Sequence, residues 1–378
     1  MKKILKIAGI ILLLLLVVFL AIPRNHYIIK ALIYQKVNID DYRIFENRTV
    51  TAELGEDWSL DSNYNKQTID SGLRKAFERY NTVAYLVIKD SMILHEEYWD
   101  DYNDSSLSNS FSVAKSIISL LIGIAIDEGK IGSVDEPVCK YLPEFCSKGN
   151  NILTIRHLLT MSSGLNWDES YSSLFSMTTK SYYGKNIRQQ VLSLKVVEKP
   201  GVSFKYLSCN TQLLALILEK ATGKQVSEYA SEKLWKPLGA MHDAQWCLDE
   251  KDGVEKAYCC FNTNARDFAR FGQLILNKGE WHGKQIISEK YLDEATTPAT
   301  YLKDEDGSVL KKYGFQWWMM EYENQKVIYA RGVNGQYIMV IPSKNMVVVR
   351  LGHHRSKELA GGHPKDMQDW LKIAFSLD

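Results

Sequence analysis

The chain has 378 residues, of which 46% are apolar and 24% are charged, and its formal net charge is +1. This length is sufficient for one large or two medium domains with a buried core. The nearly balanced charge and the lack of a basic stripe in the sequence argue against nucleic acid as a partner.

The N-terminal segment is the most apolar part of the sequence. Lys2, Lys3 and Lys6 precede an unbroken apolar run of 16 residues, 7–22. No small-residue cleavage site or cysteine follows the run, so residues 1–24 are expected to form an uncleaved membrane anchor with its N-terminus in the cytoplasm. A cleaved signal peptide is the alternative. Both interpretations place the remaining chain outside the cytoplasm, either periplasmic or extracellular, and a cleaved leader would leave it secreted.

Residues 25–98 precede the most informative stretch of the sequence. Residues 25–81 form a polar lead-in with few periodic patterns. Residues 82–88 and 92–98 are alternating or aromatic runs separated by three polar residues, a pattern typical of a β-hairpin. We expect the main domain to begin there and to span residues 82–378.

The stretch that begins at Ser110 predicts the start of a buried helix. Ser112 and Lys115 fall in its first turn, an apolar run continues to residue 126, and Gly129 gives a stop signal. Residues three apart share a helix face, so the hydroxyl and the amine can meet. A serine nucleophile needs a nearby base, and a lysine surrounded by apolar residues can lose its proton and serve as one. Ser112 is therefore a candidate nucleophile.

The same two-letter motif occurs a second time, at Ser308 and Lys311. This copy follows a polar turn and has no apolar helix behind it. Since nothing there would remove water from the lysine, we do not expect catalysis at the second copy.

The remaining chain alternates between a helical middle and a strand-rich end. Helices are expected at 154–161, 211–220, 226–235, 263–276 and 366–377, and strands at 313–320, 326–330, 336–341 and 346–351. Strands at both ends with helices between them predict a mixed α/β (α+β) domain. Its antiparallel sheet would be built from both chain ends and flanked by helices, with a mostly helical insertion at roughly 135–310.

Six cysteines are spread thinly along the chain. In an oxidising compartment Cys139 can pair with Cys146, and Cys247 with Cys259 or Cys260. Free buried thiols are an equally good interpretation. The cysteine spacing does not match a zinc site, so no metal site is expected.

Several motifs in order resemble the serine β-lactamase and penicillin-binding protein family, in particular its esterases and amide hydrolases. They are S-V-A-K-S at 112–116, T-M-S-S-G at 160–164, P-G at 200–201 leading to F-K-Y at 204–206, and R-D-F-A-R-F-G at 266–272. The resemblance covers residues 83–378 and implies a β-lactamase/transpeptidase-like fold.

The resemblance also implies roles for individual residues. Ser112 matches the acylated nucleophile, Lys115 its activating partner, and Tyr206 the tyrosine that passes a proton to the leaving group and helps to activate the hydrolytic water. Ser208 stands where the family has a substrate-contacting asparagine. A core tyrosine is the alternative interpretation of Tyr206.

The family's third motif is a Lys/His-Thr-Gly strand, and its best match here is Ala330-Arg331-Gly332. Strand alternation places Arg331 on the face opposite Ala330 and Gly332, so the family's carboxylate-binding cation is expected to be missing. The backbone N–H groups of Ser112 and Val333 would form the oxyanion hole. Gly332 would let the substrate approach the strand closely.

The residues that differ from the family's motifs, Ser208 and Ala330-Arg331-Gly332, resemble those of the 6-aminohexanoate-dimer hydrolase subgroup, which cleaves linear amides and small esters. There a second tyrosine contacts the substrate amide, and Tyr171 is its match, although it is equally well explained as a packing aromatic.

The sequence thus predicts a serine hydrolase that acts on a small ester or amide and needs no cofactor. The alternatives are a D,D-peptidase or β-lactamase, and a non-catalytic membrane-attached binding or sensor domain. A nucleophile elbow of the α/β-hydrolase type is not supported, because the sequence has no G-x-S-x-G. The sequence does not predict an oligomeric state.

Overall fold

The computed structural model describes residues 1–147 and 149–378, and at residues 12, 13, 15–17, 21 and 24 it describes the backbone alone. Its α-helices, in chain order, are α1 (Lys2–Ala21), α2 (His26–Tyr34), α3 (Ser71–Arg79), α4 (Val113–Asp127), α5 (Ile155–Leu159), α6 (Met177–Tyr183), α7 (Ile187–Leu192), α8 (Ser208–Thr222), α9 (Val226–Ala230), α10 (Ala265–Leu276), α11 (Glu289–Ala295) and α12 (Asp366–Ser376). Its strands are β1 (Asn47–Val50), β2 (Thr82–Lys89), β3 (Met92–Tyr98), β4 (Ser108–Asn109), β5 (Ala244–Cys247), β6 (Phe261–Thr263), β7 (Glu280–Trp281), β8 (Lys284–Gln285), β9 (Trp318–Tyr322), β10 (Gln325–Gly332), β11 (Gln336–Ile341), β12 (Met346–Gly352), β13 (Leu359–Ala360) and β14 (His363–Pro364).

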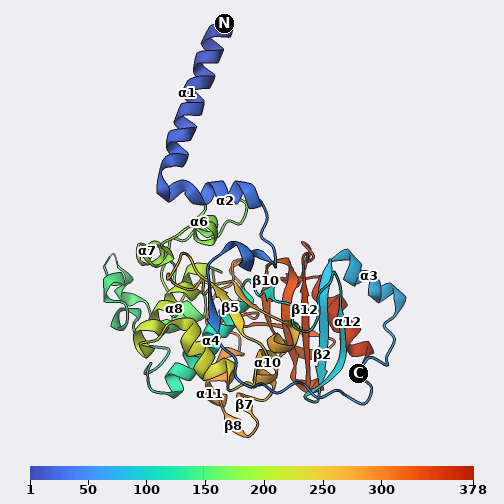
Figure 1. The fold of residues 1–378 in the computed structure, drawn as a ribbon. Helices are drawn as coiled ribbons and strands as arrows, with labels where there is room; N and C mark the ends of the chain where they lie inside the picture. The colour runs from blue at the N-terminus through green and yellow to red at the C-terminus, as the bar shows by residue number, and fades with distance from the viewer. Residues whose placement is uncertain (148) are drawn as a thin grey trace.

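Strands from both ends of the chain form the main sheet (Figure 1). Its six strands have the order β3-β2-β12-β11-β10-β9, and all neighbouring pairs are antiparallel. The hairpin of β2 and β3 turns through Asp90 and Ser91, both with positive φ, which is the backbone of a tight two-residue turn. Pairing of β2 with β12 joins the two chain ends. The predicted sheet is therefore confirmed.

Helices cover both faces of this sheet. On β2, Leu86 and Ile88 belong to the apolar layer that contains α4 and α10, while Tyr85 and Val87 belong to the layer of α3 and α12. A sheet that is buried on both faces needs apolar side chains at nearly every position. This explains why β2, β11 and β12 are mostly apolar in the sequence, with the buried Arg350 on β12 as an exception.

A second, smaller sheet supports the start of α4. Its four strands have the order β1-β5-β6-β4. Strand β4 pairs with β6 directly before α4, and Ser108 is the register partner of Thr263. Strand β1 comes from the polar lead-in and pairs with β5. The lead-in therefore contributes a strand to the sheet that holds α4 in place.

Most predicted elements agree with the structure within one to three residues, but two differ. The strand predicted at 313–320 begins only at Trp318, because Gln316 has a φ of +64° and the amide of Gly314 donates to the carbonyl of Trp317, which makes a turn. The helix predicted at 226–235 divides into α9 and a π-helical turn, Ser231–Trp235.

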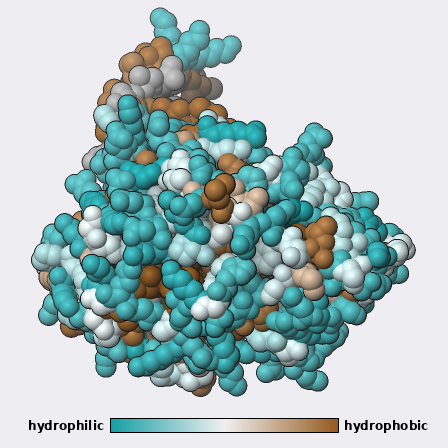
Figure 2. All heavy atoms as spheres, turned by 60° about the horizontal axis from the view of Figure 1, so that its bottom comes forward, coloured by the Kyte–Doolittle hydropathy of each residue, from teal (hydrophilic) through white to brown (hydrophobic). Residues whose placement is uncertain are grey.

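The N-terminal helix α1 projects away from the rest of the structure, and α2 lies across its base above α6 (Figure 1). Described apolar side chains on α1 are largely exposed, for example Ile4 at 72% and Val18 at 62%. Figure 2 shows these apolar groups above a mostly hydrophilic body. Among the described residues, no helix is both long and apolar enough to cross a membrane.

The cysteines pair only partly as predicted. Cys139 is bonded to Cys146, which confirms that prediction. Cys259 is bonded to its neighbour Cys260, so Cys247 pairs with neither of them. Cys247 is free and buried, which agrees with the alternative interpretation of buried free thiols. The Cys247 sulfur instead lies 3.5 Å from the amide nitrogen of Asn262.

Candidate active site

Ser112 lies at the N-terminus of α4 and is the most accessible residue of its neighbourhood. All residues from 108 to 125 are buried except Ser112, which is partly exposed. The preceding residue, Phe111, has a φ of +44°, a conformation that costs a non-glycine residue free energy and that is frequent at functional sites. The fold therefore presents this one hydroxyl to solvent from a fully packed segment.

Lys115 is placed to activate Ser112. Its Nζ lies 3.0 Å from the Ser112 Oγ and donates a hydrogen bond of 2.7 Å to the Tyr258 carbonyl. The Lys115 side chain is buried, and this desolvation lowers the pKa of its amine to about 8. About a tenth of the amine is therefore neutral at pH 7, and this neutral fraction can act as a base.

Tyr206 lies on the other side of this pair, in the loop before α8. The Lys115 Nζ is 5.2 Å from the centre of the Tyr206 ring. Burial raises the pKa of Tyr206, and a hydrogen bond with Ser112 and the charge of Arg331 oppose that rise. The phenol is therefore protonated near neutral pH and able to donate its proton. The structure brings Ser112, Lys115 and Tyr206 together in one site.

A carboxylate that the sequence analysis did not single out lies beside them. Glu169 accepts hydrogen bonds from the Ser208 amide (2.7 Å) and hydroxyl (2.6 Å) and from the Tyr171 hydroxyl (2.6 Å). Its charge also raises the pKa of Lys115, although less than burial lowers it. Glu169 thus joins two predicted substrate-binding residues, Tyr171 and Ser208, to each other.

The ring and the hydroxyl of Tyr171 lie in different environments. Its side chain is 61% exposed, yet burial around its hydroxyl and the Glu169 carboxylate raise the pKa of that hydroxyl. The ring therefore borders solvent while the polar end faces the site.

The end of β10 lies beside the nucleophile. A Cβ at Gly332 would stand only 2.2 Å from the Ser110 carbonyl oxygen, so this position requires glycine for close packing of two backbones. Val333 follows directly, at the start of a short 3₁₀ turn. The strand that was expected to supply the second oxyanion donor is thus adjacent to the segment containing Ser112.

Arg331 changes the expectation of a missing cation. Ala330 is fully buried in the layer that contains α4, and Arg331 points to the opposite face, as alternation predicts. On that face, however, its guanidinium lies 3.6 Å from the Trp318 ring centre, and the Trp318 and Tyr206 rings are 5.6 Å apart. A positive charge therefore lies near Tyr206.

Gln316 connects the helices behind the site. Its carbonyl accepts a hydrogen bond of 2.7 Å from the Ser116 hydroxyl, and its side-chain oxygen accepts one of 2.7 Å from Thr211 on α8. This buried network fixes α4 relative to α8. No pattern in the sequence predicts this network, because the φ of +64° at Gln316 belongs to a turn within an expected strand.

The second Ser-x-x-Lys motif lies outside this arrangement. Ser308 and Lys311 are both exposed, and the Ser308 hydroxyl donates to Asp306. Ser308 therefore has no buried amine beside it of the kind that lies beside Ser112.

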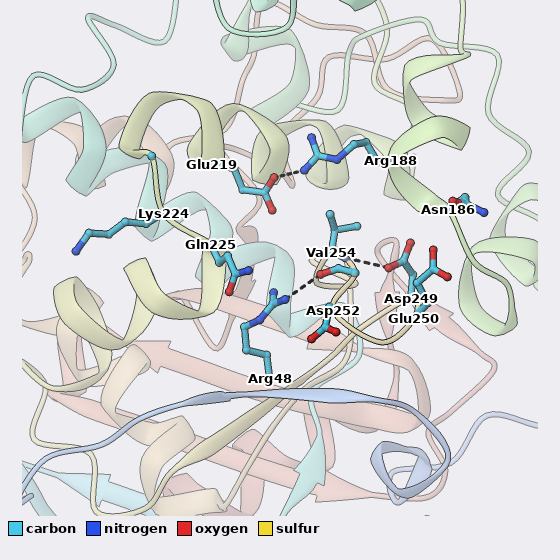
Figure 3. A pocket seen from close by; sticks show the side chains of 12 residues that line it. Arg48, Asn186, Arg188, Glu219, Lys224, Gln225, Asp249, Glu250, Asp252 and Val254 are labelled. Carbon is cyan, nitrogen blue, oxygen red and sulfur yellow. Dashed lines mark hydrogen bonds and ion pairs between the residues drawn. The ribbon is translucent and has the colours of Figure 1, made fainter.

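A separate cavity of about 480 Å³ is lined mainly by charged residues, including Arg48, Arg188 and Glu219 (Figure 3). Arg188 pairs with Glu219, and Arg48 donates to the Gly253 carbonyl. None of the predicted catalytic residues lines this cavity. Across the described residues, no group of three His, Cys, Asp or Glu side chains is placed to hold a metal ion.

Comparisons with known proteins identify the family of the chain. The family model described as Beta-lactamase matches residues 73–365. The 6-aminohexanoate-dimer hydrolase of Paenarthrobacter ureafaciens is 27% identical over 325 residues, which cover 81% of each chain.

Solved structures show the same fold. A Bacillus anthracis protein described as a candidate 6-aminohexanoate-dimer hydrolase superposes with a TM-score of 0.77 at 22% identity, covering 89% of this chain and 91% of that one. A family VIII carboxylesterase superposes with a TM-score of 0.65 at 17% identity, covering 84% and 98%. At these identities the likeness concerns the fold alone.

Proposed function

This chain belongs to the Beta-lactamase family and is a serine hydrolase, and we propose that it cleaves an ester or a linear amide bond through an acyl-enzyme on Ser112. One observation supports the proposal above all others. The buried Lys115 amine lies 3.0 Å from the hydroxyl of Ser112, which is the one partly exposed residue of the described segment 108–125.

The acylation step follows from the positions of three side chains. Neutral Lys115 takes the proton of Ser112, and the Ser112 oxygen attacks the substrate carbonyl carbon. The N–H groups of Ser112 and Val333 stabilise the resulting oxyanion, an interaction worth several kcal/mol where both donors are fixed. The carbonyl carbon then loses its alkoxide or amine, which takes a proton from Tyr206, and Lys115 returns a proton to Tyr206.

Deacylation uses the same groups in reverse. Tyr206 takes a proton from a water molecule while it passes its own proton to neutral Lys115, and the hydroxide attacks the acyl carbon. Lys115 then holds the proton that it returns to the serine. The bond to the Ser112 oxygen breaks, the serine recovers its proton, and the carboxylic acid product leaves. No external oxidant, reductant or cofactor enters this balance.

Two features of the site favour ester and linear amide substrates over β-lactams, although the Arg331 guanidinium, held over the Trp318 ring, supplies one positive charge near Tyr206. Position 330, which matches the cation of the family motif, holds a buried alanine. On the other side, the Glu169 carboxylate lies within 2.7 Å of the Ser208 amide and hydroxyl. An anionic β-lactam would face this carboxylate, whereas an uncharged acyl group would not. The likeness to the Paenarthrobacter ureafaciens 6-aminohexanoate-dimer hydrolase supports the same substrate class.

The direct test is hydrolysis of three substrates by the full chain in mild detergent. We expect turnover of p-nitrophenyl butyrate or a linear amide dimer, and little turnover of a chromogenic β-lactam. Ser112→Ala should remove the activity, and Ser308→Ala, in the exposed second motif, should not.

The other outcomes are equally informative. Rapid β-lactam turnover would assign the protein to antibiotic or cell-wall chemistry instead. Silence on all three substrates, together with no labelling by a serine-directed phosphonate, would indicate a non-catalytic binding domain and would contradict the proposal.

We also propose that residues 1–24 attach the enzyme to a membrane, with the hydrolase domain on the extracytoplasmic side. The three lysines before the apolar run and the exposed apolar side chains of α1 support this topology. So does the Cys139–Cys146 disulfide, which suits an oxidising compartment. Fractionation and protease accessibility in intact cells test it. Recovery of a shortened protein in the medium would instead indicate a cleaved leader.

A further inference from the structure

A short segment after Lys256 holds the catalytic groups by its backbone. The Tyr258 carbonyl accepts the hydrogen bond of the Lys115 Nζ at 2.7 Å. Three residues later, the Phe261 carbonyl accepts from the Ser110 amide at 2.8 Å, and the Phe261 amide donates to the Ser110 hydroxyl at 3.2 Å. The segment 258–261 therefore contacts the first turn of α4 at Lys115 and also contacts Ser110, two residues before Ser112.

The Cys259–Cys260 disulfide lies between these two contacts. Both cysteines are buried, and Cys260 has a φ of +68°, which a non-glycine residue adopts only when its surroundings hold it there. The Trp246 ring N–H donates to the Cys259 carbonyl, and the Cys247 amide donates to the Cys260 carbonyl. The disulfide is thus part of a rigid turn whose first residue is Tyr258.

We propose that the Cys259–Cys260 disulfide fixes the Tyr258 carbonyl as a positioning group for Lys115, so that the hydrolase works at neutral pH only while this disulfide is intact. This inference rests on the proposed function. Tyr258 and the two cysteines act through Lys115 and do not touch the substrate. The enzyme would then be redox-sensitive, because the Cys259–Cys260 bond is adjacent to Tyr258, whose carbonyl holds the base Lys115.

The physical link is the dry environment of the lysine. The Lys115 amine faces Glu169 from the loop before α6, Cys209 from α8, and the rings of Tyr206 and Tyr258. Its pKa is low mainly because burial removes water. When the turn relaxes and the Tyr258 carbonyl moves away, water takes its place and the pKa of Lys115 rises towards its ordinary value. Each unit of that rise lowers the neutral fraction at pH 7 by about tenfold.

The redox step balances with a dithiol as the reductant. One thiolate of the dithiol attacks a sulfur of the pair, which breaks the Cys259–Cys260 bond, releases one cysteine thiolate and forms a mixed disulfide. The second thiolate then attacks the dithiol sulfur of this mixed disulfide and releases the other cysteine thiolate. The protein gains two thiols, with two electrons and two protons, and the dithiol becomes a cyclic disulfide. Because the pair is buried, we expect this reduction to be slow without partial opening of the turn.

The test compares pH profiles of ester hydrolysis by full-length variants. In Cys259→Ala/Cys260→Ala, we expect kcat/KM at pH 7 to fall about tenfold or more, with KM nearly unchanged and most of the activity recovered above pH 9. The matched control is Cys139→Ala/Cys146→Ala, which removes the other disulfide and should keep the wild-type profile. Prolonged dithiothreitol treatment should shift the wild-type profile towards that of the first variant and leave the first variant unchanged.

A second variant guards against simple misfolding. Cys260→Gly removes the disulfide but suits a φ of +68°, and it should show the same alkaline shift with a native melting transition. A wild-type profile in both variants would overturn the proposal, and so would an equal loss at every pH, which indicates a purely structural role. Failure of the proposed function is distinguishable, because it would appear as wild-type enzyme without Ser112-dependent activity.

Discussion

Two buried lysines, Lys115 and Lys256, differ in one respect that decides their chemistry. Each is almost fully buried and donates a 2.7 Å hydrogen bond to a backbone carbonyl, that of Tyr258 or Tyr182. Burial lowers the pKa of both amines, to about 8 for Lys115 and about 7 for Lys256. Only Lys115 has an accessible serine hydroxyl beside it.

Lys256 is instead closed in by aromatic rings. Its Nζ lies 3.3 Å from the centre of the Phe45 ring and 5.7 Å from that of Tyr182. The nearby Asp41 carboxylate accepts a hydrogen bond from the Tyr182 hydroxyl. A low pKa therefore arises from burial alone, whereas a base for catalysis also needs a nucleophile that faces the substrate.

The largest expected effect is a difference in activity between variants of Lys115 and Lys256. Lys115→Ala removes the base of Ser112, so we expect kcat/KM for the ester to fall by about 10³-fold or more. Lys256→Met replaces an equally buried amine with an apolar chain of similar length and should retain activity within a few-fold. Equal losses in both variants would contradict the assignment of Lys115. Melting curves of both variants serve as the folding control.

The substitution Tyr206→Phe tests whether the Tyr206 hydroxyl transfers a proton beside Lys115. It removes the hydroxyl but keeps the ring that packs against Trp318. We expect kcat to fall by about 10²-fold with little change in KM, because loss of general acid–base catalysis is typically of this size. Tyr313→Phe is a matched control, since Tyr313 is a buried neighbour in the same cluster. A wild-type kcat in Tyr206→Phe would remove Tyr206 from the mechanism.

The low pKa of Lys256 should affect the pH dependence of protein stability, although it should not affect activity. Its folded-state pKa of about 7 lies below the ordinary value of 10.5, so the unfolded chain binds more protons between these values. The free energy of unfolding must then rise with pH across that window, by an amount on the order of a few kcal/mol. Denaturant titrations from pH 7 to 10 should show a flatter rise for Lys256→Met than for wild type. Identical slopes would show that Lys256 keeps an ordinary pKa.

The smallest effect should come from the carboxylate beside the site. Glu169 raises the pKa of Lys115 by its charge, so Glu169→Gln should lower that pKa and move the ascending limb of kcat/KM to lower pH. We expect a shift of less than about one pH unit and a few-fold change in rate, because the amide still reaches Ser208. An alkaline shift would mean that Glu169 acts through structure and not through its charge.

Local patterns in the sequence predicted much of this molecule. The spacing of Ser112 and Lys115, with an apolar run behind them, was sufficient to place both on one turn of α4, since that geometry depends only on neighbours along the chain. The same is true of the hairpin 82–98, of the helix stop at Gly129, and of the apolar strands near both ends.

Contacts between distant segments depended on the tertiary structure. The Tyr258 carbonyl reaches Lys115 across 143 positions of the chain, and Glu169 reaches Ser208 across 39. Neither contact has a sequence pattern, because backbone carbonyls are present at every residue and single carboxylates are common. The position of Arg331 over Trp318 on the neighbouring strand belongs to the same class.

The sequence by itself thus determined which side chains can do the chemistry and which elements present them. The tertiary structure decided what surrounds them, because the burial, pKa and partners of Lys115 arise from residues that packing brings together. Lys256 illustrates the difference, since its burial has no local signal and is visible only in the folded chain.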